Sequence, residues 1–443
     1  MAGILLWASP GTAFSPPSLL EKTSPVPRNI LLITLDTTRA DHLSCYGYAL
    51  LTTPNLDALA SRGVRFTRAS AVIPLTGPGH ATILTGLLPR DHGAIRNGVP
   101  TRKHVPNLAT VLRARGFRTA AFVSGWTLQA KLTHLDRGFR VYDDKLTDRY
   151  QLVNSQRPAN ETVDRAVAWL AKNAGAPFFL WLHLFDPHAP YTDHHLKIPL
   201  NPSGRGVPPS SGDPSDYAQE IAFADHQIGR VLGALDRAGL RGSTLILVVS
   251  DHGESFGEHG ENGHGRELYE TTQHIPLILV SPSLSGGEVS DLPVSTVDVA
   301  PTILDLLHLP PLPDAAGISL DRALRQPEPF ASRNILEETY RGARKTFWRI
   351  FSPGVSGQPI QVAIRQGEWK AILDLRSDEI ALFNLDWDPE EATDLSHLET
   401  GPLGKLQPAL RAHANKKWHG RDGDQPRMSE KDLRRLESLG YVE

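Results

Sequence analysis

The chain has 443 residues, of which 40% are hydrophobic and 21% are charged, and its formal net charge is −3. This length is enough for one large core or for two domains of unequal size. The nearly balanced charge argues against bulk electrostatic binding to nucleic acid or to anionic lipid. The single cysteine, Cys45, excludes an intrachain disulfide.

Residues 1–27 are interpreted as a flexible leader or as the remnant of a signal peptide. The apolar run Gly3–Ala8 is short for the apolar core of a signal peptide, and no basic residue precedes it. Two locations therefore stay open for the protein, one cytoplasmic and the other periplasmic or secreted. No stretch reaches the roughly 18 apolar residues that span a bilayer, so we expect no transmembrane segment.

The next part of the chain alternates between apolar runs and helical patterns. The apolar runs predict buried strands at residues 29–35, 118–123, 177–184, 243–250 and 275–280. Amphipathic helices are predicted between them, at residues 55–62, 106–115, 162–173 and 217–239. This order predicts an α/β fold, with a large, mostly parallel sheet covered by helices on both faces. In such sheets ligands bind beyond the carboxyl ends of the strands, where Asp36, Asp186 and Asp251 are expected.

The sequence pattern changes near residue 332, where short alternating segments replace the long apolar runs. The segments 345–351, 359–365 and 368–373 predict a small antiparallel sheet. A last helix is expected over residues 429–439. We therefore divide the chain into the leader (1–27), a main α/β domain (28–331) and a C-terminal α+β subdomain (332–443) that packs on the main domain.

The segment Pro74–His80 precedes a run of helix formers, so Thr76 is expected near the start of a helix. Backbone N–H groups at the start of a helix hold anions, which makes this segment a candidate anion site. Pro78 suits the first turn of this helix, where its missing donor costs nothing. The alternative is that Thr76 is an N-cap that only stabilises the helix.

A second motif follows the predicted strand at residues 243–250. Asp251 and His252 offer a carboxylate oxygen and an imidazole nitrogen to one cation, and Gly253 allows a sharp turn beside them. Asp36, at the end of another strand, adds a second carboxylate. The alternative is that Asp251 caps a turn and that His252 is an ordinary loop residue.

These motifs, in this order, resemble the sulfatase family of the alkaline phosphatase superfamily over nearly the whole chain. The matching segments are Leu35–His42, Thr53–Asp57, Pro74–Gly86, Asp186–Tyr191, Asp251–Glu254, Leu268–Glu270, Thr296–Thr302 and Leu382–Leu385. The resemblance implies a hydrolase of ester bonds, with residues 28–331 as the catalytic domain.

The chain departs from the family pattern at three positions. Thr76 stands where a cysteine or serine is oxidised to formylglycine, His80 stands where an arginine belongs, and Thr37 replaces the second of two aspartates. Threonine carries an extra methyl group on Cβ and cannot give the aldehyde, so no formylglycine is expected.

By position, the resemblance implies that Asp36, Thr76, Asp251 and His252 surround one divalent metal ion. The set is similar to the single-metal pattern of the lipoteichoic acid synthases, relatives with a threonine nucleophile. An imidazole with few carboxylates suits zinc or manganese better than calcium. The identity of the ion stays open among zinc, manganese, calcium and magnesium.

The resemblance also implies roles for residues around the metal ion. His188 is expected to donate to the transferred group or to the leaving oxygen, and His80 to hydrogen-bond Thr76 or the substrate. His264 and Arg266 lie where the family often keeps a lysine, and Arg266 is expected to hold an anionic oxygen. A second metal ion bound by Asp186, His188 and His264 is an alternative.

Four other histidines and one asparagine have simpler interpretations. Asn97 either lines the pocket or belongs to an Asn-Gly turn. Surface or packing positions are predicted for His183, His194, His195 and His259.

We therefore expect a metal-dependent hydrolase of phosphate or sulfate esters, in which Thr76 attacks phosphorus or sulfur in line. One alternative is a sulfuric ester hydrolase that works without formylglycine, and another is a non-catalytic binder of an anionic glycan or lipid headgroup. The expected partner is a small anionic ester, phosphorylated or sulfated, and not a nucleic acid.

Overall fold

The computed structural model describes residues 25–147, 156–202, 215–340 and 357–416, and all structural statements below concern these ranges. The predicted strand at 345–351 and the predicted helix at 429–439 lie outside them, as does most of the leader. No described helix is both long and apolar enough to cross a membrane.

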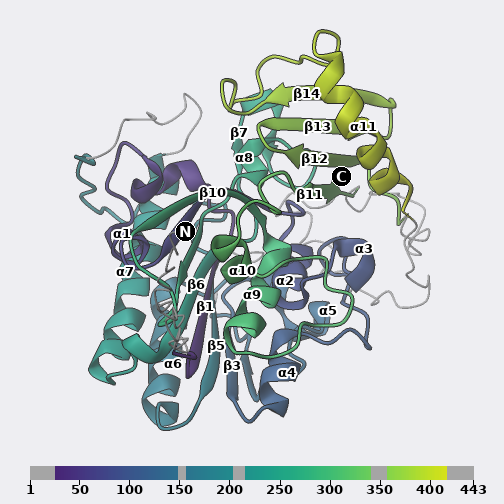
Figure 1. Cartoon of the computed structure of the whole chain (residues 1–443). Coiled ribbons are helices and arrows are strands. Elements are labelled where there is room, and N and C mark those ends of the chain that lie inside the picture. The colour runs from purple at the N-terminus through teal and green to yellow at the C-terminus, as the bar shows by residue number, and fades with distance from the viewer. Residues whose placement is uncertain (1–24, 148–155, 203–214, 341–356, 417–443) are drawn as a thin grey trace, which may run out of the picture.

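The core of the fold is an eight-stranded mixed sheet in the order β10-β2-β9-β6-β1-β5-β3-β4 (Figure 1). Its strands are β1 (Asn29–Leu35), β2 (Val64–Ser70), β3 (Arg118–Phe122), β4 (Val141–Asp143), β5 (Phe178–Leu184), β6 (Thr244–Ser250), β9 (Leu277–Val280) and β10 (Glu288–Ser295). All except β9 run in one direction. The predicted α/β fold with a mostly parallel sheet is therefore confirmed.

Helices cover both faces of this sheet, because the central strands are apolar on both sides. In β1, Ile30 and Leu32 face one core while Leu31 and Ile33 face the other. The first core is covered by α2 (Thr76–Thr85), α4 (Leu108–Ala114), α9 (Val299–Leu306) and α10 (Leu320–Arg325). The second core is covered by α1 (Pro54–Ala60), α6 (Ala159–Asn173) and α7 (Ser215–Arg237). The described chain also contains the short helices α3 (Pro89–His92), α5 (Ala130–Thr133) and α8 (Glu270–Gln273).

Strand β9 differs from the prediction because it is antiparallel to its neighbours β6 and β2. A parallel strand needs a crossover, usually a helix that packs on the sheet. Residues 251–276 instead form a loop with the small hairpin β7 (Ser255–Phe256) and β8 (Asn262–Gly263) and the short helix α8. The chain therefore re-enters the sheet beside β6 in the opposite direction. The loop itself contributes residues to the candidate active site.

A second sheet, in the order β11-β12-β13-β14, is antiparallel throughout, as predicted for the C-terminal region. Its strands are β11 (Ile335–Thr339), β12 (Gln361–Gln366), β13 (Trp369–Asp374) and β14 (Glu379–Asn384), and α11 (Thr400–Asn415) packs on it. A buried ion pair links Arg90, on α3 of the α/β part of the chain, to Glu338, on β11 of the four-stranded sheet. The domain boundary at residue 332 stays a prediction.

Candidate active site

The two aspartates proposed as metal ligands follow neighbouring strands at the carboxyl edge of the sheet. Asp36 follows β1 and Asp251 follows β6, and the last residues of these strands, Leu35 and Ser250, are paired in register. One ligand atom from each of Asp36, Asp251 and His252 lies within 4.8 Å of the others, and all three side chains are buried. The structure therefore brings together the three residues that the sequence singled out.

The free lone pairs of these residues fit a divalent cation. Asp36 Oδ1, Asp251 Oδ2 and His252 Nε2 are buried and have no hydrogen-bond partner. His252 donates Nδ1–H to the carbonyl of Gly253 at 2.9 Å, so Nε2 keeps its lone pair. Asp251 Oδ1 is occupied, because it accepts the backbone N–H of His252 at 3.0 Å.

The pKa shifts of the two carboxylates also fit a divalent cation. Burial raises the pKa of Asp36 well above its ordinary value, and the nearby charge of Asp251 raises it further. Burial also raises the pKa of Asp251. Two buried carboxylates destabilise each other in their charged forms, and a bound cation removes that cost.

Thr76 is the first residue of α2 and lies beside Asp36. The N-cap position is occupied by Leu75, which makes no capping hydrogen bond, so the alternative role of Thr76 as an N-cap is wrong. A side-chain hydrogen bond from Thr76 lowers the pKa of Asp36 and opposes the effect of burial. The helix approaches the aspartates closely because Gly79 has no side chain: a Cβ there would lie 3.2 Å from Asp251 Cβ.

His80 contacts the backbone of the candidate nucleophile, not its hydroxyl group. Its Nδ1 lies 2.8 Å from the Thr76 carbonyl oxygen, and its Nε2 lies 3.0 Å from Thr34 Oγ1. Burial lowers the pKa of His80 to about 4, so the ring is neutral. Nδ1–H therefore donates to Thr76, and Nε2 accepts from Thr34, whose oxygen in turn accepts from Trp181 Nε1–H at 3.0 Å.

His183, which was expected at a surface or packing position, contacts one of the candidate metal ligands. It is fully buried, and its Nε2 lies 3.1 Å from Asp36 Oδ2. Its Nδ1 accepts the backbone N–H of Ser124 at 3.3 Å, so Nε2 carries the proton and donates it to Asp36. One sequence feature could have indicated this contact, because His183 lies one residue before the end of a predicted buried strand.

The other three histidines of that group agree with their interpretation. His194 pairs with Glu220 at 2.7 Å and is partly exposed, and His195 is exposed. His259 stacks on Tyr269 with ring centroids 3.7 Å apart.

His188 and His264 lie next to the three residues that could hold a metal ion. These residues, Asp36, Asp251 and His252, are here called the metal-binding group. The His264 ring is centred 4.4 Å from that of His252 and 5.1 Å from that of His188. His264 Nδ1 lies 3.0 Å from Glu254 Oε1, a buried carboxylate that the sequence reasoning did not use. His188 donates Nδ1–H to the carbonyl of Ala189 at 2.6 Å and stacks on Phe185.

The alternative second metal site has no support in the described residues. Asp186 Oδ1 accepts the backbone N–H of Ala159 at 2.8 Å, at the start of α6. Asp36, Asp251 and His252 form the one group in the described ranges that could hold a metal ion, and it does not include Asp186, His188 or His264.

Asn97 and Arg266 differ in burial. Asn97 lies in a turn, and its buried Oδ1 accepts the backbone N–H of Gly77 at 2.7 Å. The turn is therefore confirmed, and a role of Asn97 in lining the pocket stays a prediction. Arg266 follows His264 on the same loop, but its side chain is exposed, so it lies outside the buried centre.

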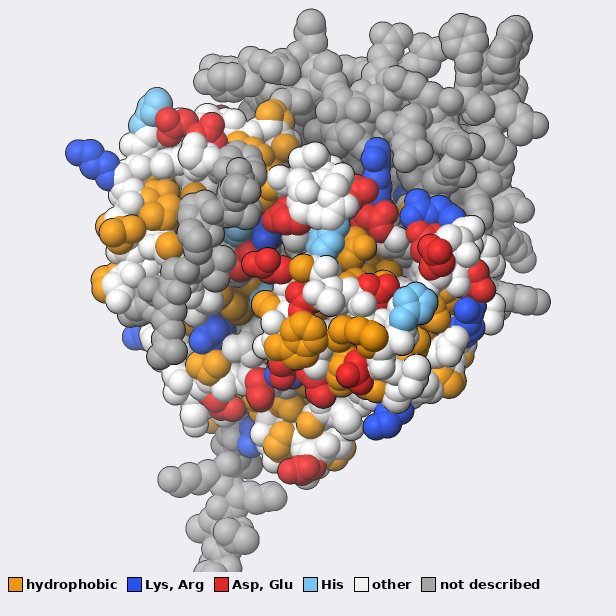
Figure 2. Space-filling model, turned by 90° about the horizontal axis from the view of Figure 1, so that it is seen from above, with side chains coloured by type: hydrophobic (Ala, Val, Ile, Leu, Met, Phe, Trp, Pro, Cys, Tyr) orange, Lys and Arg blue, Asp and Glu red, His pale blue; other side chains and the backbone are white. Residues whose placement is uncertain are grey.

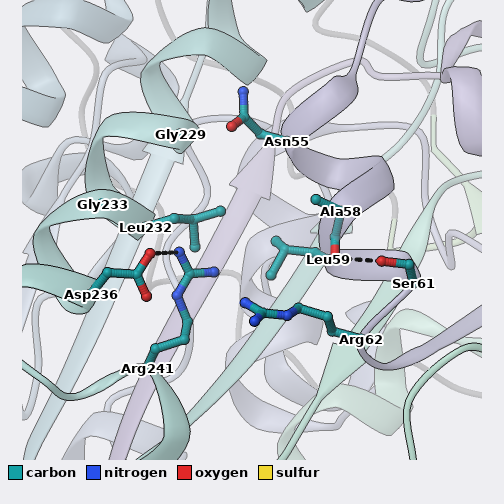
Figure 3. Close-up of a pocket in the computed structure, with 10 residues that line it drawn as sticks. All are labelled: Asn55, Ala58, Leu59, Ser61, Arg62, Gly229, Leu232, Gly233, Asp236 and Arg241. Carbon is teal, nitrogen blue, oxygen red and sulfur yellow. Dashed lines mark hydrogen bonds and ion pairs between the residues drawn. The ribbon is translucent and has the colours of Figure 1, made fainter.

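Surface features elsewhere do not compete with this site. The face in Figure 2 carries acidic and histidine side chains near its centre and no extended basic patch on its described part. A cavity of about 290 Å³ lies between α1 and α7 (Figure 3). Its Arg62 comes just before β2 begins, which is the edge of the sheet opposite to the site.

Comparisons with known proteins agree with the geometry. The family model described as Sulfatase matches residues 28–309. An arylsulfatase of Clostridium perfringens is 25% identical, over 84% of this chain and 90% of that protein.

Two solved structures have the same fold. The phosphonate monoester hydrolase of Silicibacter pomeroyi is 23% identical and covers 88% of this chain and 96% of its own, with a TM-score of 0.67. A second solved structure, determined with its substrate D-glucosamine-2-N,6-O-disulfate, is 21% identical to this chain. The match covers 88% of this chain and 97% of that protein, with a TM-score of 0.68. The chain belongs to the sulfatase family of the alkaline phosphatase superfamily and is a sulfuric or phosphoric ester hydrolase.

Proposed function

We propose that this protein is a metal-dependent hydrolase of phosphate or sulfate esters in which the Thr76 hydroxyl attacks phosphorus or sulfur in line. The observation that carries the proposal is the convergence of three buried, unpaired acceptor atoms beside Thr76, on Asp36, Asp251 and His252. These three side chains and the Thr76 hydroxyl would hold one divalent cation. A bound cation supplies a lowered pKa for the alcohol and neutralises charge on a non-bridging oxygen.

The nucleophile is the unmodified threonine, and no formylglycine takes part. Asp36 accepts the Thr76 hydroxyl hydrogen and orients Oγ1. His183 donates to Asp36 Oδ2 and thereby holds the carboxylate in place. His80 holds the Thr76 carbonyl and thereby the first turn of α2, where the family has an arginine. This turn also directs backbone N–H groups at an anion.

Four residues around the nucleophile are assigned to the substrate. Asn97 has a buried Nδ2 without a partner, which suits a non-bridging oxygen. Glu254 orients the His264 ring for contact with the transferred group. His188 is assigned to the leaving oxygen: burial lowers its pKa to about 4, and a bound anionic ester would restore the proton it donates. Arg266, on the exposed rim, is assigned to an anionic oxygen further out.

The donor set also bears on the ion and on the substrate. Two carboxylates, one imidazole and one alcohol suit zinc or manganese better than calcium. Sulfate and phosphate esters share tetrahedral geometry, and the relatives include both an arylsulfatase and a phosphonate monoester hydrolase. The relative bound to a disulfated glucosamine supports a small anionic glycan as one substrate class. The alternative of a non-catalytic binder is disfavoured, because the nucleophile and metal ligands are all present.

Matched aryl esters test this proposal directly. Metal-supplemented protein is assayed on one aryl alcohol carried as a sulfate, a phosphate monoester, a phosphodiester and a phosphonate monoester. We expect turnover of at least one, and a loss of at least about 10³-fold in Thr76→Ala, since removal of a nucleophile costs this much or more. Thr76→Ser, which keeps the alcohol, should retain much of the activity.

Thr85→Ala, at the far end of the same helix, is the control for folding and should leave the rate nearly unchanged. If Thr76→Ala and the wild type turn over every ester equally, the nucleophile assignment is wrong.

A further inference from the structure

We propose that Arg96 forms a recognition site for a second anionic group on the alcohol portion of the ester. The ligand class is an ester whose alcohol carries a carboxylate, sulfate or phosphate. This inference rests on the proposed function, because the ester must first be held at Thr76.

The first observation is that Arg96 has no anionic partner among the described residues. Its Nε atom is buried and has no hydrogen-bond partner, and the guanidinium forms no ion pair in the described residues. Burial alone lowers the pKa of Arg96, with no carboxylate acting against it. A partly buried, unpaired cation is unfavourable in a folded protein unless a ligand completes it.

Other buried arginines of this chain show what a structural role looks like. Arg90 pairs with Glu338, Arg157 pairs with Asp143 at 2.8 Å, and Arg39 pairs with Asp41 at 2.8 Å. Each has its carboxylate built into the fold. Arg96 differs from these three arginines, because no carboxylate among the described residues pairs with it.

The second observation is the position of Arg96 beside the nucleophile. The next residue, Asn97, contacts Gly77 at the start of α2 through Oδ1, while its buried Nδ2 has no partner. The preceding residue, Ile95, is buried in a small apolar cluster with Leu75, the residue before Thr76. Arg96 therefore lies between two residues whose side chains contact the segment that carries Thr76.

The charge distribution assigns this site to the alcohol portion and not to the transferred group. Asp36 and Asp251 surround the transferred group, and neither forms an ion pair with Arg96. Arg96 is thus separate from the metal-binding group, although its chain segment adjoins the nucleophile helix. A substrate with one anionic group at Thr76 and a second beyond it satisfies both places.

Non-hydrolysable sulfonates test the site without any need for turnover. Calorimetry on the metal-supplemented full chain compares benzenesulfonate with 3-sulfobenzoate and 4-sulfobenzoate, whose C–S bonds are inert. The sulfonate represents the transferred group and the carboxylate the second anion. We expect the tighter sulfobenzoate to bind the wild type about tenfold more tightly than benzenesulfonate. In Arg96→Met this ratio should fall to about one, and Arg96→Lys should restore part of it.

Arg62→Met is the matched control, because it removes the same charge at the opposite edge of the sheet (Figure 3) and should keep the tenfold ratio. Equal binding of all three probes to the wild type, or an unchanged ratio in Arg96→Met, overturns the Arg96 site alone. Failure of every probe to bind contradicts the proposed function as well.

Thermal unfolding without ligand gives a second readout. Removing an unpaired buried charge should leave Arg96→Met at least as stable as the wild type, whereas Arg90→Met should lower the unfolding temperature. A fall in Arg96→Met as large as that in Arg90→Met would mean that the fold itself pairs Arg96, and would overturn the proposal.

Discussion

Two buried clusters of carboxylates in this protein differ in whether the fold supplies their cations. The metal-binding group of Asp36, Asp251 and His252 contains no cationic side chain, and one unpartnered atom of each residue lies within 4.8 Å of the other two. The second cluster, here called the Lys370 cluster, joins α8 to the four-stranded sheet and consists of Lys370, Arg365, Glu270, Glu337 and Glu391.

In the Lys370 cluster the cations are part of the chain. Lys370 Nζ lies 2.8 Å from Glu270, 3.0 Å from Glu391 and 3.7 Å from Glu337. Burial opposes the charge on Lys370, but the three carboxylates together raise its pKa above the ordinary value. Buried carboxylates with an internal cation serve the structure, whereas those without one are available for a ligand.

The largest effect on stability should come from Lys370. Lys370→Met leaves three buried carboxylates without their main cation, so we expect the free energy of unfolding to fall by about 3–5 kcal/mol. Denaturant unfolding measures this loss. Lys416→Met removes a half-exposed lysine that pairs with Asp91 and should cost less than about 1 kcal/mol. Equal stability of Lys370→Met and the wild type would show that the cluster is not held by this lysine.

Metal removal should have the next largest effect, and only at the metal-binding group. A chelator should destabilise the wild type by about 2–4 kcal/mol, the linkage expected for a tightly bound ligand. Asp251→Asn should be insensitive to the chelator, since it lacks one ligand. Thermal unfolding with and without chelator measures both. The comparison between the two clusters breaks down if Asp251→Asn and the wild type respond alike.

The smallest effect should come from the surplus carboxylate of the Lys370 cluster. Burial raises the pKa of Glu337 to about 8, although Lys370 opposes this. Because the folded state holds this proton more tightly than the unfolded chain, the stability it contributes is present at low pH and is lost as the pH rises through about 8.

Glu337→Gln has no carboxyl proton to lose at this position. The free energy of unfolding of this variant, relative to that of the wild type, should therefore rise from about pH 5 to about pH 9. We expect a gain on the order of 1–2 kcal/mol at the alkaline end. Unfolding curves at several pH values measure it. A pH-independent difference, or a gain that shrinks with rising pH, would contradict the raised pKa.

The sequence predicted the parts of the site that depend on strand ends and helix starts. Asp36 and Asp251 follow apolar runs long enough to be central strands, and Thr76 precedes a run of helix formers, so local patterns placed all three. The antiparallel β9 escaped prediction, because its direction depends on the absence of a crossover helix in residues 251–276.

Residues that act through long-range contacts also escaped prediction. His183 reaches Asp36 only because β5 pairs with β1 in a register that sets Thr34 beside His183, and no local pattern specifies that register. Glu254 meets His264 because the β7–β8 hairpin folds the loop back on itself. Both contacts are products of tertiary packing.

The metal content of the purified protein tests the central claim most directly. Elemental analysis of the wild type, Glu337→Gln and Asp251→Asn compares the two clusters in one experiment. We predict roughly one divalent ion per chain in the wild type and in Glu337→Gln, and nearly none in Asp251→Asn, because Asp251 supplies a ligand and Glu337 does not. A wild type without divalent metal, or an Asp251→Asn variant that keeps its full metal content, would contradict the assignment of Asp36, Asp251 and His252 as the metal-binding group.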